Sequence, residues 1–314
     1  MHPDGTWSAS DLPDLSGRRA LVTGTTSGLG AAVVAALVRR GAEVVAAGRD
    51  EHKLTASLQR LRAEVPGARV RTLLLDLADQ ADVRRAAHEA ASHGPLHLLV
   101  NNAGVMATPS TRTLDGFELQ LATNFLGHFA LTGLLWPQLA TGGAEPAAGG
   151  AARVVSVSSQ AHRMARRAPL GDPRSTGGRY QRWQAYAQSK LANLLFTVEL
   201  DRRARSAGAP VTALAAHPGM AATSLGSSAT GNRAGGTILD AAFSLLGQPP
   251  SQAAQPLLMA ATADLPGATY VGPGGPGEVR GAPQVVTSSA LARDPETARR
   301  LWAVAEQATG VRFP

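Results

Sequence analysis

Short apolar runs alternate with longer segments of helical periodicity over the first two thirds of the chain. The runs do not alternate with polar positions, which is typical of strands buried on both faces of a parallel sheet. They lie at residues 19–23, 43–47, 69–75, 96–100, 153–157 and 211–216. The helical segments lie at 29–40, 51–64, 81–92, about 114–139, and in a helix ending near 205. This order predicts an α/β fold, a doubly wound parallel sheet of the Rossmann type with a helical layer on each face.

The rest of the chain is less regular. Residues 1–15 are expected to form an N-terminal arm that can be flexible, and residues 16–314 a single domain. The pattern weakens beyond Pro218, and the region at about 220–281 is the least patterned part. The remaining predicted elements are a helix from Pro249 to about 263, loops at 141–151 and 272–281, and a terminal helix at 294–308.

The basic residues do not form the pattern expected of a nucleic-acid-binding protein. The 314-residue chain has a net charge of +7. A nucleic-acid binder concentrates such charge in one stripe or patch. Here the arginines occur as scattered pairs on polar helical faces or at helix ends, so we interpret them as solvated surface. The pairs begin at residues 18, 39, 84, 166, 202 and 299.

Composition also excludes several kinds of site. The chain has no cysteine, which rules out disulfides, thiolate metal sites and a cysteine nucleophile, and which fits a reducing compartment. His162 and His217 lack the spacing of paired metal ligands, so we expect structural roles for them and no metal site. No stretch reaches the roughly 20 apolar residues of a membrane span, and residues 1–14 lack a signal-peptide core. We therefore expect a cytoplasmic protein.

The first motif joins the first strand to the first helix. Its glycines have the spacing Gly-x-x-x-Gly-x-Gly, and no Gly-Lys-Ser/Thr follows, so it is not a phosphate loop. Glycines let the backbone approach a pyrophosphate, which the N-terminus of the helix then binds. The alternative is a glycine cluster that only packs the helix. The candidate binding residues are Gly24, Thr25, Thr26, Ser27, Gly28, Leu29 and Gly30.

The end of the second strand suggests which dinucleotide binds. An acidic residue here holds the free ribose hydroxyl of NAD, but this place is taken by Gly48, and Arg49 follows. An arginine fork suits a 2′-phosphate. The sequence therefore favours NADP(H), with NAD(H) as the other option. Arg49 as a plain surface residue, or as a partner of Asp50, is the alternative.

Three further strand ends carry candidate residues. Ligands bind at the carboxyl ends of strands in such sheets. Asp76 and Leu77 follow the third strand and could hold an adenine through a carboxylate and a backbone amide. Asn102, Ala103 and Gly104 follow the fourth, where small residues let a ribose pass closely; Ser158-Ser159 follows the fifth. Ordinary turn chemistry explains the asparagines and Ala-Gly equally well.

A tyrosine and a lysine lie one helical turn apart later in the chain. Only two of the 30 basic residues are lysines, Lys53 and Lys190. Tyr186 and Lys190 are spaced i, i+4, so they share one face of a helix. A phenol titrates near pH 10, and a nearby ammonium favours the phenolate and lowers that pKa. By itself the pair is equally compatible with an ordinary solvated lysine.

In combination these motifs resemble the short-chain dehydrogenase/reductase family. The resemblance covers about residues 17–224 and is greatest to the retinol dehydrogenase-like branch. It rests on the order of the glycine turn, Asn-Asn-Ala-Gly, the serine, Tyr-x-x-x-Lys and His217-Pro-Gly. The stretches that indicate the branch are Asn124-Phe-Leu-Gly-His-Phe, Ser158-Ser-Gln-Ala-His and Tyr186-Ala-Gln-Ser-Lys-Leu-Ala-Asn.

The resemblance implies a role for each catalytic candidate. Tyr186 would be the acid–base residue, and Lys190 would lower its pKa and bind the nicotinamide ribose. Ser159 would orient the substrate oxygen, and Asn124 would support a water-linked proton relay.

The resemblance also implies further contacts with the cofactor. Pro218 and Gly219 would lie beside the nicotinamide, and Thr223 would bond its carboxamide. The region at about 220–281 would supply substrate loops. The arginine-rich segment 163–183 fills a long gap before the tyrosine and is expected to border the substrate entrance.

These observations predict an NADP(H)-preferring oxidoreductase that interconverts an alcohol and a ketone or aldehyde. A partly apolar substrate is expected because apolar residues follow Gly219, at Met220, Leu225, Ile238, Leu239, Phe243 and Leu246. Membrane-anchored members of the branch carry an N-terminal apolar segment that this sequence does not show. A homo-oligomer is possible in this family through the helices that carry Phe125 and Leu194. The alternatives are a reductase of carbon–carbon double bonds and a cofactor-sensing protein without turnover.

Overall fold

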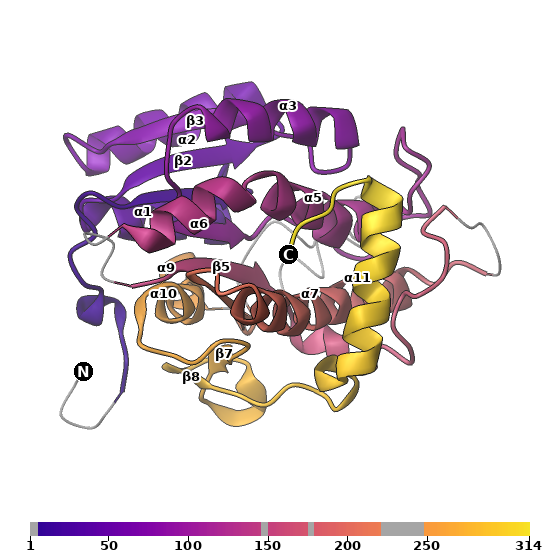
Figure 1. The fold of residues 1–314 in the computed structure, drawn as a ribbon. Coiled ribbons are helices and arrows are strands. Elements are labelled where there is room, and N and C mark those ends of the chain that lie inside the picture. The colour runs from indigo at the N-terminus through magenta and orange to yellow at the C-terminus, as the bar shows by residue number, and fades with distance from the viewer. Residues whose placement is uncertain (1–5, 146–149, 175–178, 221–247) are drawn as a thin grey trace.

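One mixed sheet organises the computed structural model, which describes residues 6–145, 150–174, 179–220 and 248–314 (Figure 1). Its strand order is β3-β2-β1-β4-β5-β6-β7-β8. All neighbours pair in parallel except β7 and β8, which are antiparallel. The strands are β1 Arg19–Thr23, β2 Glu43–Gly48, β3 Val70–Leu74, β4 Leu98–Asn101, β5 Ala152–Val157, β6 Val211–Ala216, β7 Tyr270–Pro273 and β8 Pro283–Val285. The strand order reverses between β1 and β4, which is where ligands bind in such folds.

Helices cover both faces of the sheet, so the predicted doubly wound fold is confirmed. The larger helices are α1 Gly28–Arg39, α2 Glu51–Glu64, α3 Gln80–Ala91, α5 Gly127–Leu134, α6 Trp136–Ala144, α7 Arg182–Ser206, α10 Gln255–Thr262 and α11 Pro295–Thr309. Successive strand residues point to opposite faces. Leu21 therefore joins the core under α3, α5, α7 and α11, while Val22 joins the core under α1 and α10. Each strand is apolar because each face is buried.

The predicted helix at 114–139 is several shorter elements. It begins at Leu119, because the Glu118 carboxylate caps it by accepting from the N–H groups of Gln120 and Leu121 at 3.0 and 2.8 Å. A short α4, Leu119–Leu121, leads into a π-helical turn, Ala122–Leu126, and then into α5. A break at Leu135 precedes α6, which runs to Ala144, into the predicted loop at 141–151.

The predicted loop at 272–281 is wrong at its start. Residues 270–273 form β7, where Ala216 pairs with Val271, and β8 extends the sheet by one antiparallel strand. The helix predicted from Pro249 is also divided, into α9 Pro250–Ala253 and α10. Pro256 lies at the start of α10, where its missing N–H costs nothing.

From Thr6 onward, the N-terminal segment packs against the domain, whereas the sequence predicted an arm that can be flexible. Trp7, Leu12 and Leu15 are buried in the core beneath α1. The Leu15 N–H donates to the Arg40 carbonyl at 2.7 Å, and the Arg40 guanidinium donates to the Ser10 carbonyl at 2.8 Å. This part of the segment is therefore part of the domain.

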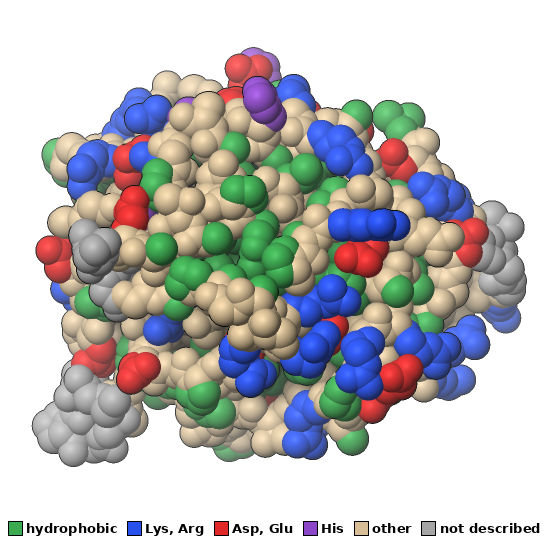
Figure 2. Space-filling view, in the orientation of Figure 1, with side chains coloured by type: hydrophobic (Ala, Val, Ile, Leu, Met, Phe, Trp, Pro, Cys, Tyr) green, Lys and Arg blue, Asp and Glu red, His purple; other side chains and the backbone are tan. Residues whose placement is uncertain are grey.

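The arginines in the last turns of α7 are paired with acidic residues. Glu199, whose side chain is 1% exposed, contacts Arg202 and Arg203, and Asp201 contacts Arg205. Figure 2 shows basic and acidic side chains interspersed over this face. This pairing supports the interpretation of solvated surface charge. Phe125 and Leu194, which were considered for an oligomer face, are buried inside the chain. Within the described ranges, no helix combines the length and the apolar character that crossing a bilayer requires.

Candidate active site

The glycine turn after β1 leaves the start of α1 open for an anion. Gly24 and Gly28 have φ values of 73° and 58°, which favour glycine. Ser27 is the N-cap residue, yet its side chain makes no capping hydrogen bond, and the first turn contains no acidic residue. The first amides of a 12-residue helix thus keep their ability to bind a phosphate.

Two of the glycines also pack the turn against the end of β4. A Cβ on Gly30 would lie 2.2 Å from the Gly24 carbonyl oxygen. A Cβ on Gly24 would lie 2.8 Å from Cα of Ala103. Asn102, a predicted cofactor residue, uses its amide to hold the turn, donating to the carbonyls of Thr23 and Gly24 at 2.7 and 3.2 Å. Gly24 and Gly30 therefore have the packing role that was the alternative interpretation, while the start of α1 stays open to an anion.

The Thr23 hydroxyl is the centre of a network beneath this turn. It accepts from the N–H groups of Asn102 and Ala103, both at 2.9 Å. Burial lowers the pKa of His128 to about 4, so its ring is neutral at pH 7. Because Nδ1 of His128 donates to the Asn124 carbonyl at 3.1 Å, Nε2 accepts from Thr23 at 2.9 Å. One hydroxyl thus connects the glycine turn, the end of β4 and the helix that carries Asn124.

Replacing Thr23 with valine is expected to destabilise the fold by about 2–6 kcal/mol, since two polar groups each lose a partner worth roughly 1–3 kcal/mol. The orphaned groups would be the N–H of Ala103 and Nε2 of His128. Urea unfolding at pH 7 measures the loss. Thr23→Ser keeps the hydroxyl and should recover most of the stability. Equal losses in the two variants would contradict this account.

Arg49, at the end of β2, is available to a ligand. It is exposed, and no described residue forms a hydrogen bond or ion pair with it. Asp50, its predicted competitor, instead caps α2: one oxygen accepts from the N–H of Lys53 at 3.0 Å, and the other lies 3.4 Å from Nζ of Lys53. A Cβ on Gly48 would lie 3.1 Å from the side chains of Leu54 and Thr26. No acidic side chain of the described residues therefore takes the place of a ribose-binding acid.

Asp76 and Leu77 lie in the turn after β3, beside α5. One carboxylate oxygen of Asp76 accepts from the N–H of Ala78 at 2.9 Å. Leu77 is buried, and its carbonyl lies 2.3 Å from where a Cβ on Gly127 would be. This close contact fixes the start of α5 against the turn.

Tyr186 and Ser159 lie together where α7 passes the end of β5. Tyr186 is 8% exposed. Burial raises the pKa of its phenol, and a hydrogen bond with the Ser159 hydroxyl partly lowers it. Ser159 is held at the start of a 3₁₀ helix, Gln160–Met164, where its Oγ accepts from the N–H of Ala161 at 3.2 Å.

Lys190 is buried beside Tyr186. Its Nζ lies 5.8 Å from the centroid of the Tyr186 ring, within range of a cation–π contact. It donates to the Val157 carbonyl at 3.0 Å, and the Asn193 amide donates to the same oxygen at 2.9 Å. Burial lowers the pKa of Lys190 to about 8. Burial thus lowers the pKa of Lys190 and raises that of Tyr186, and the predicted lowering of the Tyr186 pKa by Lys190 stays a prediction.

Asn124 lies in the π-helical turn, a feature often found at functional sites. Its Oδ1 accepts from the N–H of Val105 at 2.8 Å, and its Nδ2 donates to the Val105 carbonyl and to Oγ of Ser189, both at 2.9 Å. A Cβ on Gly104 would lie 3.1 Å from Oδ1 of Asn124 and 3.5 Å from Nζ of Lys190. The four catalytic candidates are thus brought together, with Gly104 keeping the space between two of them open.

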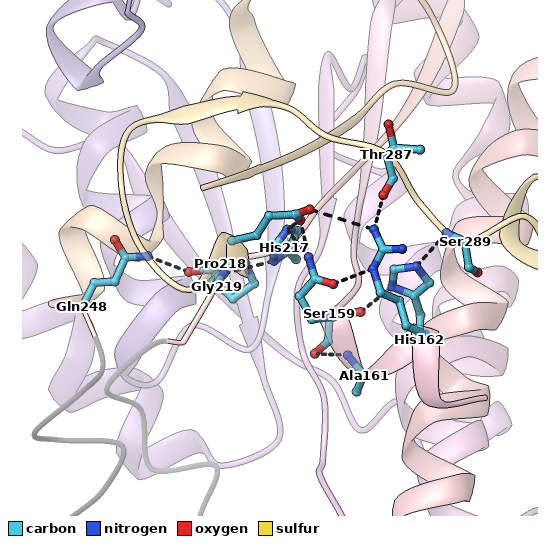
Figure 3. Close-up of polar contacts among 12 residues, drawn as sticks. Ser159, Ala161, His162, His217, Pro218, Gly219, Gln248, Thr287 and Ser289 are labelled. Atoms are coloured by element: carbon cyan, nitrogen blue, oxygen red, sulfur yellow. Dashed lines mark hydrogen bonds and ion pairs between the residues drawn. The ribbon is translucent and has the colours of Figure 1, made fainter. Parts of the chain in front are cut away.

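The turn after β6 lies beside this group. Gly219 has a φ of 68°, and a Cβ on it would lie 2.3 Å from the Val279 carbonyl. The Pro218 carbonyl accepts from the Gln248 amide at 2.9 Å. Figure 3 shows these residues together with Ser159. Thr223 and the apolar residues predicted at 225–246 lie outside the described residues, so the structure does not test them.

Apolar side chains surround Tyr186 on its open side. Met106, Ala107 and Tyr186 form a small buried cluster against Ala161. The Trp183 ring meets the Tyr186 ring edge-on at 6.3 Å and is 40% exposed. Among the described residues, no group of three histidine, cysteine or acidic side chains could hold a metal ion.

Several polar contacts that support the site had no counterpart in the sequence motifs. Thr23 and His128 lie within stretches that the motif comparison used, but nothing in their spacing indicates that they bond to each other. Gln160 and Glu278 are likewise brought together by the fold across 118 residues.

Comparison with known proteins agrees with this geometry. Residues 18–170 match the short chain dehydrogenase family. Polyprenol dehydrogenase from Mus musculus is 41% identical over 309 residues, which cover 95% of this chain and 86% of the relative. Retinol dehydrogenase 13 from Homo sapiens is 36% identical over 307 residues, covering 96% and 87%. A crystal structure of an uncharacterized protein from Mycobacterium paratuberculosis superposes with a TM-score of 0.77 at 42% identity, covering 98% of this chain and 99% of that one. The chain therefore belongs to the short-chain dehydrogenase/reductase family, in its retinol dehydrogenase-like branch, and is an NAD(P)-dependent oxidoreductase.

Proposed function

We propose that this chain is an NADP(H)-preferring enzyme that interconverts an alcohol and a ketone or aldehyde, with Tyr186 as its acid–base residue. The observation that carries the proposal is the position of the buried Tyr186 phenol, bonded to Ser159 on one side and beside the Lys190 ammonium on the other. A hydroxyl pair next to a cation suits the negative charge that develops on a carbonyl oxygen during reduction.

The described residues fit a dinucleotide. The open N-terminus of α1 and the glycine turn would hold the pyrophosphate, and Asp76 and Leu77 the adenine side. The space beside Gly104, Asn124 and Lys190 would take the nicotinamide ribose, with Pro218 and Gly219 next to the ring. When bound, the cofactor supplies or accepts the hydride.

The protein's own residues would manage the proton. The Tyr186 phenol would give its proton to the substrate oxygen during reduction and take it back during oxidation. The Ser159 hydroxyl would hold that oxygen in place, and the Lys190 ammonium would stabilise the phenolate that remains. Asn124 would keep the Gly104–Val105 backbone in position through its three side-chain hydrogen bonds; its part in a proton relay remains a proposal.

Arg49 supports the preference for NADP(H). An exposed guanidinium beside Gly48, with no partner among the residues that the structure describes, suits a 2′-phosphate. Arg49→Ala is expected to weaken NADPH binding by roughly 10–100-fold, since charge-assisted hydrogen bonds contribute about 1.5–3 kcal/mol, and to leave NADH binding nearly unchanged. Titration of each variant with NADPH and NADH, followed by thermal shift, measures this. Arg39→Ala, which removes an exposed arginine at the far end of α1, is the control. Equal loss for both dinucleotides would contradict the proposal.

The substrate is proposed to be partly apolar. Trp183 and Met106 give the surroundings of Tyr186 an apolar character, and the Trp183 side chain is 40% exposed. The relatives named for retinol and polyprenol support an alcohol of this kind. A panel of apolar and polar carbonyl compounds with the preferred cofactor tests it. Product analysis separates carbonyl reduction from reduction of a carbon–carbon double bond.

A further inference from the structure

We propose that Glu278 is a positioning residue, whose carboxylate holds Ser159 and the Pro218–Gly219 turn in a fixed relation to each other. The inference rests on the proposed function, because it assigns the substrate oxygen to Ser159 and the nicotinamide to that turn. Glu278 lies in a 3₁₀ helix, Pro276–Glu278, between β7 and β8, more than 50 positions along the chain from either partner.

The Glu278 carboxylate receives hydrogen bonds both from the residue after Ser159 and from His217, which precedes the Pro218–Gly219 turn. Oε2 of Glu278 lies 2.9 Å from Nε2 of His217 and also accepts from the Gln160 amide. Burial lowers the pKa of His217 to about 3, so the ring is neutral, and its Nδ1 accepts from the N–H of Gly219 at 3.3 Å. Nε2 therefore carries the proton and donates to Glu278. Oε2 of Glu278 thus accepts from Gln160, the residue after Ser159, and from the His217 ring, which also contacts Gly219.

A guanidinium completes the surroundings of this carboxylate. Nη2 of Arg163 lies 3.9 Å from Oε1 of Glu278. The same side chain donates through Nε to Oε1 of Gln160 at 2.8 Å, and through Nη2 to the Thr287 carbonyl. Among the described residues, the polar contacts of the Glu278 side chain are therefore all with donors or a cation, which is the set that an ionised, acceptor-only carboxylate requires.

The backbone around Glu278 is held in an uncommon conformation. Its φ is 55°, in the left-handed region that residues other than glycine rarely adopt. The next residue, Val279, accepts from the N–H of Met220 at 2.8 Å and leaves no room for a side chain on Gly219. Backbone strain of this kind persists where surrounding contacts overdetermine it, often at functional sites. Side chain and backbone of this segment thus hold the same turn.

Ser159 is also held by His162, a residue of the same short helix that does not contact Glu278. Nδ1 of His162 donates to the Ser159 carbonyl at 2.7 Å, and Nε2 of His162 accepts from the N–H of Ser289 at 3.1 Å. This second attachment means that loss of the Glu278 charge should shift the site without unfolding it. A shift of about 1 Å in a reacting group can cost roughly 100-fold in rate.

The experiment compares Glu278→Gln with the wild type and with Glu43→Gln. Glu43 is a matched control: its side chain is 23% exposed against 24% for Glu278, and it pairs with arginines at the start of β2, in the other half of the sheet from β7 and β8. For each protein, we would measure kcat and KM for a carbonyl substrate, the NADPH dissociation constant, and the deuterium isotope effect with 4-deuterated NADPH. Glu278→Gln is expected to lower kcat about 10–100-fold with NADPH affinity changed less than about threefold, and to raise the isotope effect as hydride transfer becomes limiting. Glu43→Gln should leave all three near wild type.

The outcomes separate this inference from the proposed function. A wild type that reduces no carbonyl compound would overturn both. An active wild type with a Glu278→Gln variant of unchanged kcat would overturn the inference alone. So would a loss of activity that follows the folded fraction in thermal unfolding, with an unchanged isotope effect. Arg163→Gln alters an exposed side chain of the same network, and a smaller loss of kcat in the same direction would support the inference should Glu278→Gln fail to fold.

Discussion

Tyr186→Phe should lose most turnover and keep its affinity for the cofactor. The variant removes only the phenolic oxygen, the one atom proposed to exchange a proton with the substrate. Acid–base groups of this kind contribute roughly 100- to 10,000-fold to the rate, so kcat should fall by that order. The fold should persist, since the Ser159 hydroxyl keeps its bond with the N–H of Ala161. Steady-state kinetics with the preferred cofactor, and NADPH binding followed by thermal shift, measure the two effects.

Tyr180→Phe is the matched control for that variant. Tyr180 precedes α7, and its hydroxyl contacts the Gln120 amide, the Thr108 carbonyl and the Glu118 carboxylate at 2.7, 3.1 and 3.0 Å. Removing that hydroxyl should cost about 1 kcal/mol of stability and little turnover. A Tyr186→Phe variant as active as the wild type would refute the proposed mechanism.

Lys190→Met is expected to abolish most activity and to stabilise the chain at the same time. Methionine has a similar length and no charge, so the cost of burying an ammonium disappears. The Val157 carbonyl keeps a partner in the Asn193 amide, so no acceptor is left without a bond. The expected gain is about 3 kcal/mol at pH 7, because burial lowers the pKa from 10.5 to about 8 and each pKa unit corresponds to roughly 1.4 kcal/mol. The chain would thus gain stability at the expense of its function.

The stability gained by Lys190→Met should decrease as the pH rises. Burial lowers the pKa of Lys190 to about 8 in the folded chain, against 10.5 ordinarily. Between these values the unfolded chain holds more protons, so the stability of the wild type rises with pH. The advantage of Lys190→Met should therefore be largest below pH 8 and shrink towards pH 10.5. Urea unfolding across this range tests it.

Lys53→Met, at the chain's other lysine, is the control for that experiment. Its side chain is 72% exposed, so this change should alter neither stability nor its pH dependence appreciably. A Lys190→Met variant less stable than the wild type at pH 7 would show that the buried ammonium is held more favourably than its surroundings indicate.

The fold could be predicted from sequence where burial on both faces leaves a continuous apolar run. Leu98–Asn101 is an example, because β1 and β5 flank it and helices cover it above and below. The same reasoning failed for Tyr270–Pro273, whose glycine and proline are typical of a loop. That segment is a strand only because it pairs with β6, and pairing between distant segments leaves no local pattern.

The candidate site was predictable as a set of residues but not as a set of interactions. Tyr186, Lys190, Ser159 and Asn124 could be located because family motifs occur in order along the chain. The pKa relation between Tyr186 and Lys190 was not predictable, since it depends on how deeply each is buried. Nor does any spacing in the sequence indicate that the Glu278 side chain contacts His217, which lies 61 residues earlier in the chain.

The π-helical turn at Ala122–Leu126 determines how the segment before it is rotated relative to α5. Such a turn contains about one residue more than an α-helical turn. If the same residues were wound with α geometry instead, the extra residue would rotate the preceding segment by about 100° relative to α5. Gln120, whose Oε1 accepts from the N–H of Ala107 at 2.7 Å, lies in the rotated part, whereas Gly127 and its contact with Leu77 do not. The π-helical turn, by holding one additional residue, thus sets the orientation of the Tyr186 side of the pocket relative to the dinucleotide side.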